Sequence, residues 1–237
     1  MEFREYNKLN TFPHVYGAQD DTWQGVTFGA KVKIQGVHAA VRVSTDGFAV
    51  AQDGEQDMTL ANDPHGFAAW VAATHDTWPF MPSDTTTGDV VYYGSWAGDN
   101  INVNGSAASK LNDKFFFVFA VYMEESDTMI VDPELIERTI PDLDQIVVLP
   151  WDRVWNSQID FSHAEDCGNF ATMLNEAVVG VLEQDPIIFG VFGVDGTGGG
   201  WVVSPVCNPG MDPTTMKTVD RYWYDRLTFK VEGASNG

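Results

Sequence analysis

An alternation of apolar and polar residues from Val26 to Val43 is the feature that most constrains the fold of this chain. Successive side chains of a β-strand point to opposite faces, so this alternation predicts a strand with one buried face. Ser44 to Gly47 predicts a turn, and Phe48 to Gln52 predicts the returning strand of a hairpin. Lys33 lies in the middle of the first strand, within Lys33-Ile34-Gln35-Gly36. We therefore expect a lysine on a rigid element, where its amine is able to act as a nucleophile.

The remaining pattern predicts sheet with helices at its sides. We expect Asp63 to cap a helix that begins at Pro64, and a second helix over Phe170 to Leu182 that Pro186 stops. Further strand-like segments are Val90 to Trp96, Phe115 to Met123, Ile187 to Val194, Trp201 to Val206 and Arg226 to Val231. This mixture favours an α+β class with mostly antiparallel sheet, and the length suits a single domain over residues 1–237.

The strongly negative net charge of the chain limits which macromolecules it can bind. Its 237 residues carry 34 Asp or Glu and 13 Lys or Arg side chains, and the net charge of −21 is spread along the sequence. Such a surface repels nucleic-acid backbones at long range. Solubility or adaptation to a salty environment is the simplest interpretation. The alternative is a protein that mimics nucleic acid or docks on a protein partner with a basic surface.

Location signals are absent from the sequence. No apolar run is long enough to span a bilayer and no basic-apolar signal follows Met1, so we expect no membrane partner. Cys167 and Cys207 are far apart and form no Cys-x-x-Cys pair, which indicates neither a zinc site nor a disulfide framework. A reducing, cytoplasmic environment is the default expectation, either host cytoplasm or virion if the protein is viral.

Two short segments contain residue types of a metal site or a phosphate-binding loop, but their spacing and flanking residues do not fit either kind of site. His163 to Cys167 contains metal-ligating residue types, but contiguous side chains diverge, so the segment is interpreted as the start of a helix. Asp195 to Gly200 is rich in glycine but lacks the Gly-Lys-Ser/Thr of a phosphate-binding loop. We interpret it as a turn before a strand.

Five ordered blocks between Glu5 and Gly233 resemble those of a known family. The blocks are Lys33 to His38, Tyr93 to Gly98, Phe116 to Ala120, Phe192 to Val203 and Leu227 to Gly233. They are similar, in this order, to the Lys-x-x-Gly, Tyr/Phe-Gly-Glu-x-x-Gly, Phe-Asp, Gly-x-x-Gly-x-Gly-Glu-Gly-x-Val and Lys-x-Lys-Gly motifs of the RNA-ligase-2-like branch of the covalent nucleotidyltransferases. That superfamily includes ATP-dependent RNA and DNA ligases and capping enzymes. The resemblance implies a nucleotidyltransferase fold with two mainly antiparallel sheets flanked by helices.

The resemblance also implies a chemistry for particular residues. In this family a neutral lysine attacks the α-phosphorus of ATP, pyrophosphate leaves, and AMP stays on the lysine until it passes to a 5′-phosphorylated end. A divalent metal and basic side chains neutralise the developing charge. By position, Lys33 is the nucleophile, Gly36 the glycine behind it, Phe119 the ring that packs on the purine, and Lys230 the contact to the α-phosphate. The alternatives are a solvent-facing Lys33 and a Phe119 that belongs to the core.

The chain departs from the family where charge is needed. Ser95 replaces a ribose-binding glutamate, Ala120 an aspartate, and Gly199 a metal-binding glutamate. Glu232 stands in place of the second closing lysine, and no arginine for a 5′-phosphate is found around Gln52. Single losses of transition-state stabilisers cost on the order of 10²–10³ in rate. Several together predict little catalysis.

We therefore expect a catalytically degenerate, RNA-ligase-like accessory or binding protein with no metal site and no cofactor, and the economy of the chain suits a viral protein. Its site would hold a vestigial nucleophile and bind an adenine nucleotide or a nucleic-acid end weakly. The residues of this partial pocket are Lys33, Gly36, Ser95, Phe119, Gly199 and Lys230. The alternative is an active ATP-dependent RNA ligase that uses ATP and Mg²⁺, forms lysyl-AMP on Lys33, and has Asp99 or Asp195 as a compensating carboxylate.

Overall fold

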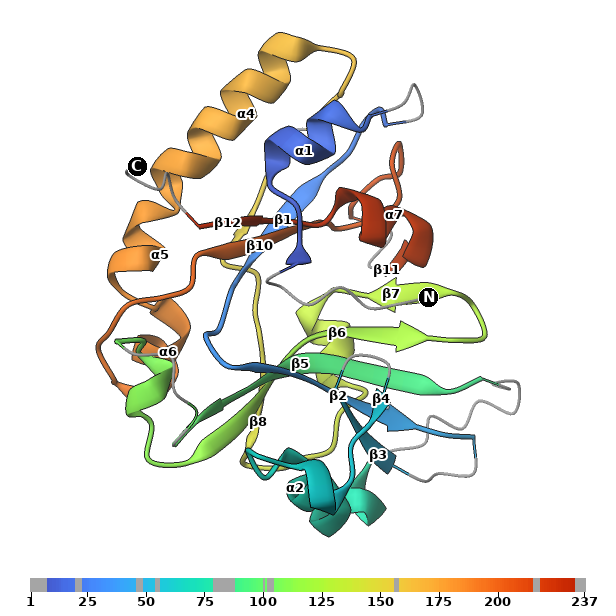
Figure 1. Ribbon diagram of the computed structural model, residues 1–237. Helices are drawn as coiled ribbons and strands as arrows, with labels where there is room; N and C mark the ends of the chain where they lie inside the picture. The colour runs from blue at the N-terminus through green and yellow to red at the C-terminus, as the bar shows by residue number, and fades with distance from the viewer. Residues whose placement is uncertain are drawn as a thin grey trace.

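Two β-sheets form the centre of the computed structural model (Figure 1). The structure describes residues 8–19, 23–45, 49–53, 56–78, 88–99, 101, 105–155, 158–214 and 218–232. Within these residues the small sheet has the strand order β12-β10-β1-β9, and the large sheet has the order β11-β7-β6-β5-β2-β3-β4. Strand β8 pairs with β6 in parallel, whereas the other strand pairs are antiparallel. The expectation of two mainly antiparallel sheets flanked by helices is confirmed.

The strands and helices have the following bounds. The strands of the small sheet are β1 Phe28–Val32, β9 Arg153–Val154, β10 Trp201–Pro205 and β12 Phe229–Val231. The strands of the large sheet are β2 Val37–Val43, β3 Ala49–Asp53, β4 Gln56–Asp57, β5 Val90–Gly98, β6 Lys114–Met123, β7 Thr128–Ile130, β8 Ile146–Val148 and β11 Thr218–Asp220. The helices are α1 Phe12–Gly17, α2 Phe67–Thr74, α3 Pro133–Glu137, α4 Ala164–Ala177, α5 Val179–Glu183, α6 Pro186–Phe192 and α7 Arg221–Leu227.

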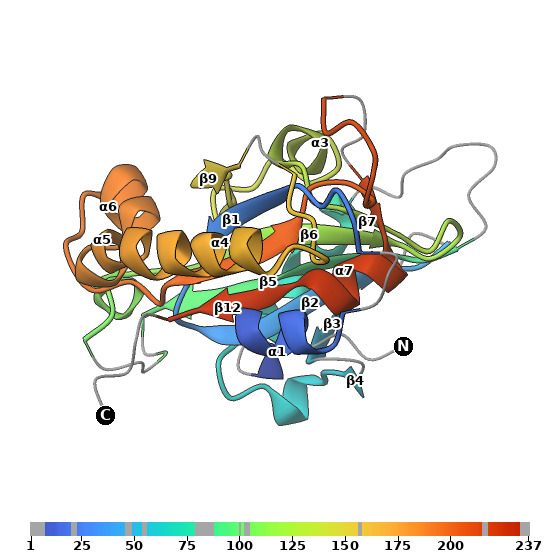
Figure 2. The same cartoon turned by 90° about the horizontal axis from the view of Figure 1, so that it is seen from above.

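Helices cover both outer faces. Figure 2 shows α1, α4 and α7 lying along the small sheet, and α2 lies under the large sheet in Figure 1. Phe12 of α1 contacts the rings of Phe170 and Phe229 at centroid distances of 5.3 and 5.1 Å. On the other side Phe67 of α2 packs against Phe116 of β6. Burial of these aromatic side chains stabilises the packing of the helices on both sheets.

The segment from Val26 to Val43 is two strands rather than one, which corrects the first expectation. β1 ends at Val32 in the small sheet, and β2 begins at Val37 in the large sheet. Lys33 follows β1 directly, and its main-chain N–H donates to the oxygen of Gly200 at 2.9 Å. Because both strands alternate, periodicity alone does not show that the chain changes sheets between them. Lys33 thus lies at the connection between the sheets, not in the middle of a strand.

The β2–β3 hairpin is confirmed by its antiparallel register, in which Ala40 is opposite Gln52. Residues 46 and 47 of its expected turn, and residue 48 of its expected returning strand, lie outside the described residues. Strands β5, β6 and β10 match three further expected strands. The helix expected at Pro64 begins at Phe67, but Asp63 still accepts a hydrogen bond from the main-chain N–H of Ala69 at 2.9 Å. Gly66, with a φ of 78°, makes the sharp entry to that helix.

Expectations for the second half of the chain need more correction. The helix over Phe170 to Leu182 is divided into α4 and α5 at Val178. The strand expected over Ile187 to Val194 is wrong, because these residues lie mainly in α6. Asp185 caps that helix and Pro186 occupies its first turn, and this start signal outweighs the β-branched residues that follow.

The strand expected over Arg226 to Val231 is shorter, because α7 extends to Leu227. The interpretation of His163 to Cys167 as a helix start is confirmed, with His163 directly before α4. Asp195 to Gly200 is irregular apart from a bridge at Thr197, and it leads directly into β10 at Trp201, so the expectation of a strand after it is confirmed.

In the described part of the chain, no helix has both the length and the apolar character needed to cross a membrane.

Candidate functional site

A cavity of about 580 Å³ opens beside Lys33, where the chain passes from β1 to β2. Lys33, Gly36 and Ser95 of the expected pocket line it. The other lining residues come from the start of β2, from β3 and β4, and from the approach to α2: Ile34, Gln35, Val37, His38, Ala39, Asp53, Gln56, Asp57, Met58, Asn62, Pro64, His65 and Phe67. A lysine, two carboxylates and several amide and imidazole groups therefore meet at one hollow.

Lys33 and Lys230 share one carboxylate. The Nζ of Lys33 lies 2.6 Å from Oε1 of Glu232, and the Nζ of Lys230 lies 2.8 Å from Oε2. The Lys33 side chain is 12% exposed and that of Glu232 is 40% exposed. Burial would raise the pKa of Glu232, but hydrogen bonds from Lys230 and Lys33 and their charges lower it below its usual range. The structure thus brings two expected site residues together through a third that carries the opposite charge.

Gly199 lies against the backbone of the Lys33 segment. A Cβ on Gly199 would be 2.4 Å from the main-chain oxygen of Lys33 and 3.0 Å from Cγ of Gln35. Side-chain atoms do not fit at the first of these distances unless the backbone moves. The glutamate that the family resemblance implies at this position has no room here. Gly199 therefore supports the path of the chain beside Lys33 and offers no metal ligand.

Gly36 also has a packing role. A Cβ at this position would lie 2.5 Å from the main-chain oxygen of Trp96 on β5. The chain enters the large sheet this closely because Gly36 has no side chain. Ser95 of β5 is buried and lies opposite His38 of β2 in the register, so both line the cavity from neighbouring strands.

Phe119 lies behind the cavity rather than on its wall. Its side chain is 3% exposed and it is not among the lining residues. The ring of His38 stacks near it, at a centroid distance of 6.2 Å, and near Tyr93 at 6.3 Å. His38 lines the cavity, whereas Phe119 and Tyr93, which its ring approaches, do not. The role of Phe119 as a purine platform stays a prediction, with His38 as the aromatic group that sequence reasoning did not single out.

Lys31 is a second lysine near the site that the sequence analysis missed. It lies on β1, is 4% exposed, and donates hydrogen bonds of 2.7 Å to the main-chain oxygens of Phe119 and Val131. Its Nζ also lies 4.7 Å from the ring centre of Trp151. Burial lowers the pKa of Lys31 to about 7, against the opposing charge of Asp132. The apolar residues around it in the sequence are the signal that it is buried.

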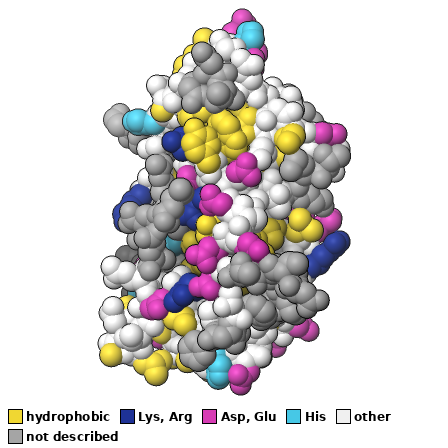
Figure 3. Space-filling model, turned by 90° about the vertical axis from the view of Figure 1, so that its right-hand side faces the viewer, with side chains coloured by type: hydrophobic (Ala, Val, Ile, Leu, Met, Phe, Trp, Pro, Cys, Tyr) yellow, Lys and Arg dark blue, Asp and Glu magenta, His cyan; other side chains and the backbone are white. Residues whose placement is uncertain are grey.

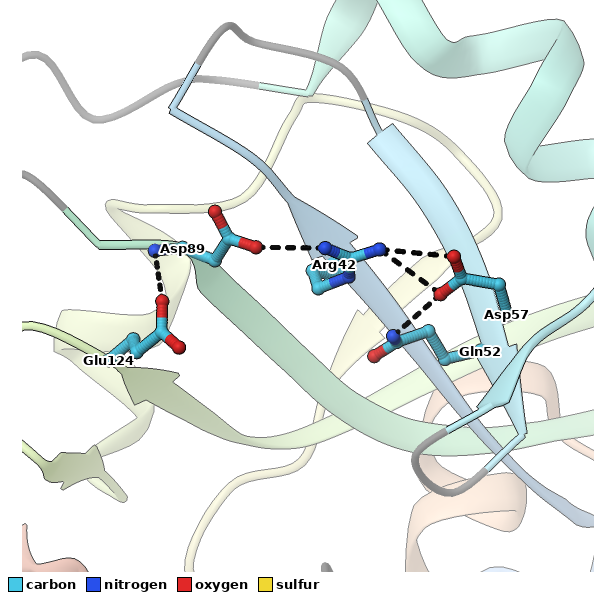
Figure 4. A network of polar contacts seen from close by, with 5 residues as sticks. All are labelled: Arg42, Gln52, Asp57, Asp89 and Glu124. Atoms are coloured by element: carbon cyan, nitrogen blue, oxygen red, sulfur yellow. Dashed lines mark hydrogen bonds and ion pairs between the residues drawn. The ribbon is translucent and has the colours of Figure 1, made fainter. Parts of the chain in front are cut away.

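Arg42 of the neighbouring strand and Gln52 bond to the same carboxylate, that of Asp57 (Figure 4). Arg42 of β2 donates to Asp57 at 3.1 and 3.2 Å and to Asp89 at 2.9 Å, while Gln52 donates to the same Asp57 at 2.9 Å. The sequence around Gln52 itself carries no arginine, and Arg42 comes from β2, before the hairpin turn. Arg42 holds the carboxylate of Asp57 at the rim of the cavity.

The carboxylates suggested as substitutes in the alternative hypothesis lie elsewhere. The main-chain N–H of Asp99 bonds to Asp113, and the exposed side chain of Asp195 accepts a hydrogen bond from Gln184. Neither lines the cavity, whose carboxylates are Asp53 and Asp57. Among the described residues, no three His, Cys, Asp or Glu side chains are grouped so that they could hold a metal ion. Gly199, at the position where the family resemblance implies the metal-binding glutamate, brings no carboxylate to the site.

The face of the molecule drawn in Figure 3 shows no concentrated basic area among the described residues. Acidic side chains are scattered over that face, with Lys and Arg side chains dispersed among them. This distribution agrees with the net charge of −21. An attractive track for a nucleic-acid backbone is therefore not evident on this face.

Comparison with known proteins identifies the fold. No family model matches the chain and no curated protein matches it in sequence. Two solved variants of Naegleria gruberi RNA ligase, one with AMP and Mn and one with ATP and Mn, match it with TM-scores of 0.55. They are 13% and 14% identical to it, and the matches cover 98% of this chain and 57% and 58% of theirs. The same ligase with PPi matches with a TM-score of 0.51 at 13% identity, over 98% of this chain and 57% of the ligase.

The chain thus spans less than two thirds of the length of these ligases. At this identity the likeness concerns the fold and extends over nearly the whole chain. It agrees with the five ordered sequence blocks and with the two packed sheets. The chain has the nucleotidyltransferase fold of RNA ligases.

Proposed function

We propose that this chain is a degenerate member of the RNA-ligase-2-like branch that binds an adenine nucleoside or nucleotide weakly and does not transfer AMP. The observation that carries the proposal is the carboxylate of Glu232 bound to both Lys33 and Lys230. Attack on phosphorus needs a lone pair on nitrogen. An ammonium ion that donates to a carboxylate, as the geometry of Lys33 and Glu232 at 2.6 Å indicates, has none.

The surroundings of Lys33 support the same conclusion. Transfer of AMP builds negative charge on phosphate oxygens, which a metal ion and basic groups must neutralise. The positions of Ser95 and Gly199 supply no carboxylate for a metal, and Gly199 has no space for a larger side chain. Asp53 and Asp57 add negative charge to the cavity instead. A binding role therefore fits this site better than a catalytic one.

The features of the cavity fit an adenosine group. Its volume of about 580 Å³ lies within the usual range for small-molecule pockets. His38 contributes an aromatic ring to the lining, and the amides of Gln35 and Asn62 contribute donors and acceptors. The solved ligases that share the fold contain AMP or ATP, which supports an adenine ligand for this chain. An accessory role in the cytoplasm, in a virus or its host cell, suits such a reduced site.

Intact-mass spectrometry tests the loss of catalysis directly. The purified chain is incubated with ATP and either Mg²⁺ or Mn²⁺, with a Lys33→Ala variant as the control. We expect both proteins to keep their original mass. A mass increase of one AMP on the native chain that disappears in Lys33→Ala would contradict the proposal and establish the alternative, an active ligase that forms lysyl-AMP.

A further inference from the structure

We propose that Glu232 makes this site selective for an uncharged nucleoside over its phosphorylated forms. This inference rests on the proposed adenine-binding function and concerns which chemical class of ligand the site accepts. Each carboxylate oxygen of Glu232 receives one lysine, at 2.6 Å for Lys33 and 2.8 Å for Lys230. Both distances are those of charge-assisted hydrogen bonds. Glu232 thereby pairs with the two ammonium groups to which a ligand phosphate would otherwise bind.

The main chain holds Glu232 in this place. It follows Val231, the last residue of β12, which is paired with Trp201 of β10. Gly200 packs so closely that a Cβ there would be 2.2 Å from the main-chain oxygen of Val231 and 3.2 Å from Cα of Glu232. The carboxylate therefore projects from a fixed point toward Lys33. A phosphate that enters must separate it from its two lysines or remain unpaired beside it.

The charges around the cavity oppose a phosphate as well. Lys33, Asp53 and Asp57 line the cavity, whereas Lys230 and Glu232 do not line it and reach it through the ion pair of Glu232 with Lys33. Arg42 binds Asp57 from outside the cavity, but it also pairs with Asp89. The Lys, Asp and Glu residues that line the cavity, Lys33, Asp53 and Asp57, thus leave no excess of positive charge on its wall for a triphosphate. Like charges in such a confined place disfavour binding.

A nucleoside carries no phosphate, so the carboxylates at the site do not repel it. Its ribose hydroxyls are donors, and the carboxylates of Asp53 and Asp57 are acceptors on the cavity wall. Its base has a flat face for the ring of His38, a contact type that contributes on the order of 1–3 kcal/mol between bases and aromatic side chains. The same carboxylates that repel a phosphate therefore favour the sugar.

Calorimetric titrations without divalent metal test this selectivity. Adenosine, AMP and ATP are titrated into the native chain, into Glu232→Gln and Glu232→Ala, and into Glu137→Gln. Glu137 is an exposed residue of α3 that does not line the cavity, so its variant changes the net charge equally without changing the site. We expect the native chain to bind adenosine at least as tightly as ATP. In both Glu232 variants ATP affinity should rise about tenfold or more, while adenosine affinity changes less than about twofold.

Two results would overturn the inference. If ATP and adenosine respond alike to the Glu232 variants, or if Glu137→Gln reproduces their effect, the carboxylate does not determine selectivity, although adenosine binding itself stands. Adenosine that binds neither the native chain nor any variant overturns both this inference and the proposed binding function. Thermal unfolding of each variant confirms that the compared proteins are folded.

Discussion

The side-chain nitrogen of Lys31 lies 2.7 Å from the main-chain oxygen of Phe119, so one amine joins the small sheet to the large sheet. The same nitrogen donates to the oxygen of Val131 at 2.7 Å. A neutral amine has two N–H groups, one for each of these carbonyl oxygens. Burial lowers the pKa of Lys31 to about 7, and this value makes the neutral form accessible near physiological pH.

This buried amine predicts a pH dependence of stability. The pKa of Lys31 is about 7 in the folded state and 10.5 for an unperturbed lysine. Between these values the unfolded chain binds the proton and the folded chain does not, so stability rises as the pH rises from about 7 toward about 10.5. We expect the unfolding free energy of the native chain, relative to Lys31→Met, to increase by up to about 1.4 kcal/mol per pH unit in this window. Urea denaturation at pH 7, 8 and 9 measures it.

Lys110→Met is the matched control for this series, because Lys110 is an exposed lysine whose side chain bonds to Asp195 at the surface. The stability difference between the native chain and Lys110→Met should stay nearly constant over the same pH values. A constant difference for Lys31→Met as well would mean that Lys31 keeps its proton in the folded protein.

The close approach of Gly36 to β5 predicts a large cost for a single methyl group. In Gly36→Ala the new Cβ would meet the main-chain oxygen of Trp96 at 2.5 Å, so the connection between the sheets must shift. We expect a loss of about 1–3 kcal/mol in the free energy of unfolding. Gly180→Ala is the control, since Gly180 is exposed in α5 with no atom near its added Cβ. That substitution should stabilise the chain by about 0.5–1 kcal/mol, and equal effects of the two would contradict the packing argument.

The start of α6 predicts a different response to two substitutions of one residue. Oδ1 of Asp185 accepts hydrogen bonds of 3.0 Å from the main-chain N–H groups of Ile187 and Ile188. Asp185→Ala removes this acceptor and should cost about 1–2 kcal/mol. Asp185→Asn keeps it, and because burial raises the pKa of Asp185, loss of the charge carries little penalty. Thermal or urea unfolding of both variants checks this, and a similar loss in both would show that the charge matters more than the cap.

The Arg42 network predicts a modest, salt-sensitive contribution to stability (Figure 4). Arg42 pairs with Asp57 and Asp89, but its side chain is 33% exposed, so water screens these contacts. We expect Arg42→Gln to cost about 1 kcal/mol at low salt and less at 0.5 M NaCl. Arg138→Gln, at an exposed position after α3, should cost under about 0.5 kcal/mol. Urea denaturation at both salt concentrations measures these losses. Equal losses of unfolding free energy in Arg42→Gln and Arg138→Gln would contradict a stabilising role of the network.

The local pattern of apolar residues was sufficient to predict part of the fold. Strands β5, β6 and β10 follow from their apolar and β-branched residues, because burial of a sheet face leaves a period of two in the sequence. Helix α6 was not predicted, although Asp185-Pro186 is a start signal, since the apolar residues after it suit a strand equally well. The place where Val26 to Val43 divides between two sheets has no local signal, because both halves alternate.

The sequence by itself determined which chemical groups exist for a site: a Lys-x-x-Gly segment, five ordered blocks of a nucleotidyltransferase type, and missing carboxylates at Ser95 and Gly199. Only the tertiary structure decided how these groups meet. Lys33 and Glu232 are 199 positions apart, yet their side chains lie 2.6 Å from one another. Pairing of β12 with β10, and of β10 with β1, produces this contact. Ion pairs of this kind depend on strand register between distant segments, and periodicity within a segment carries no information about that register.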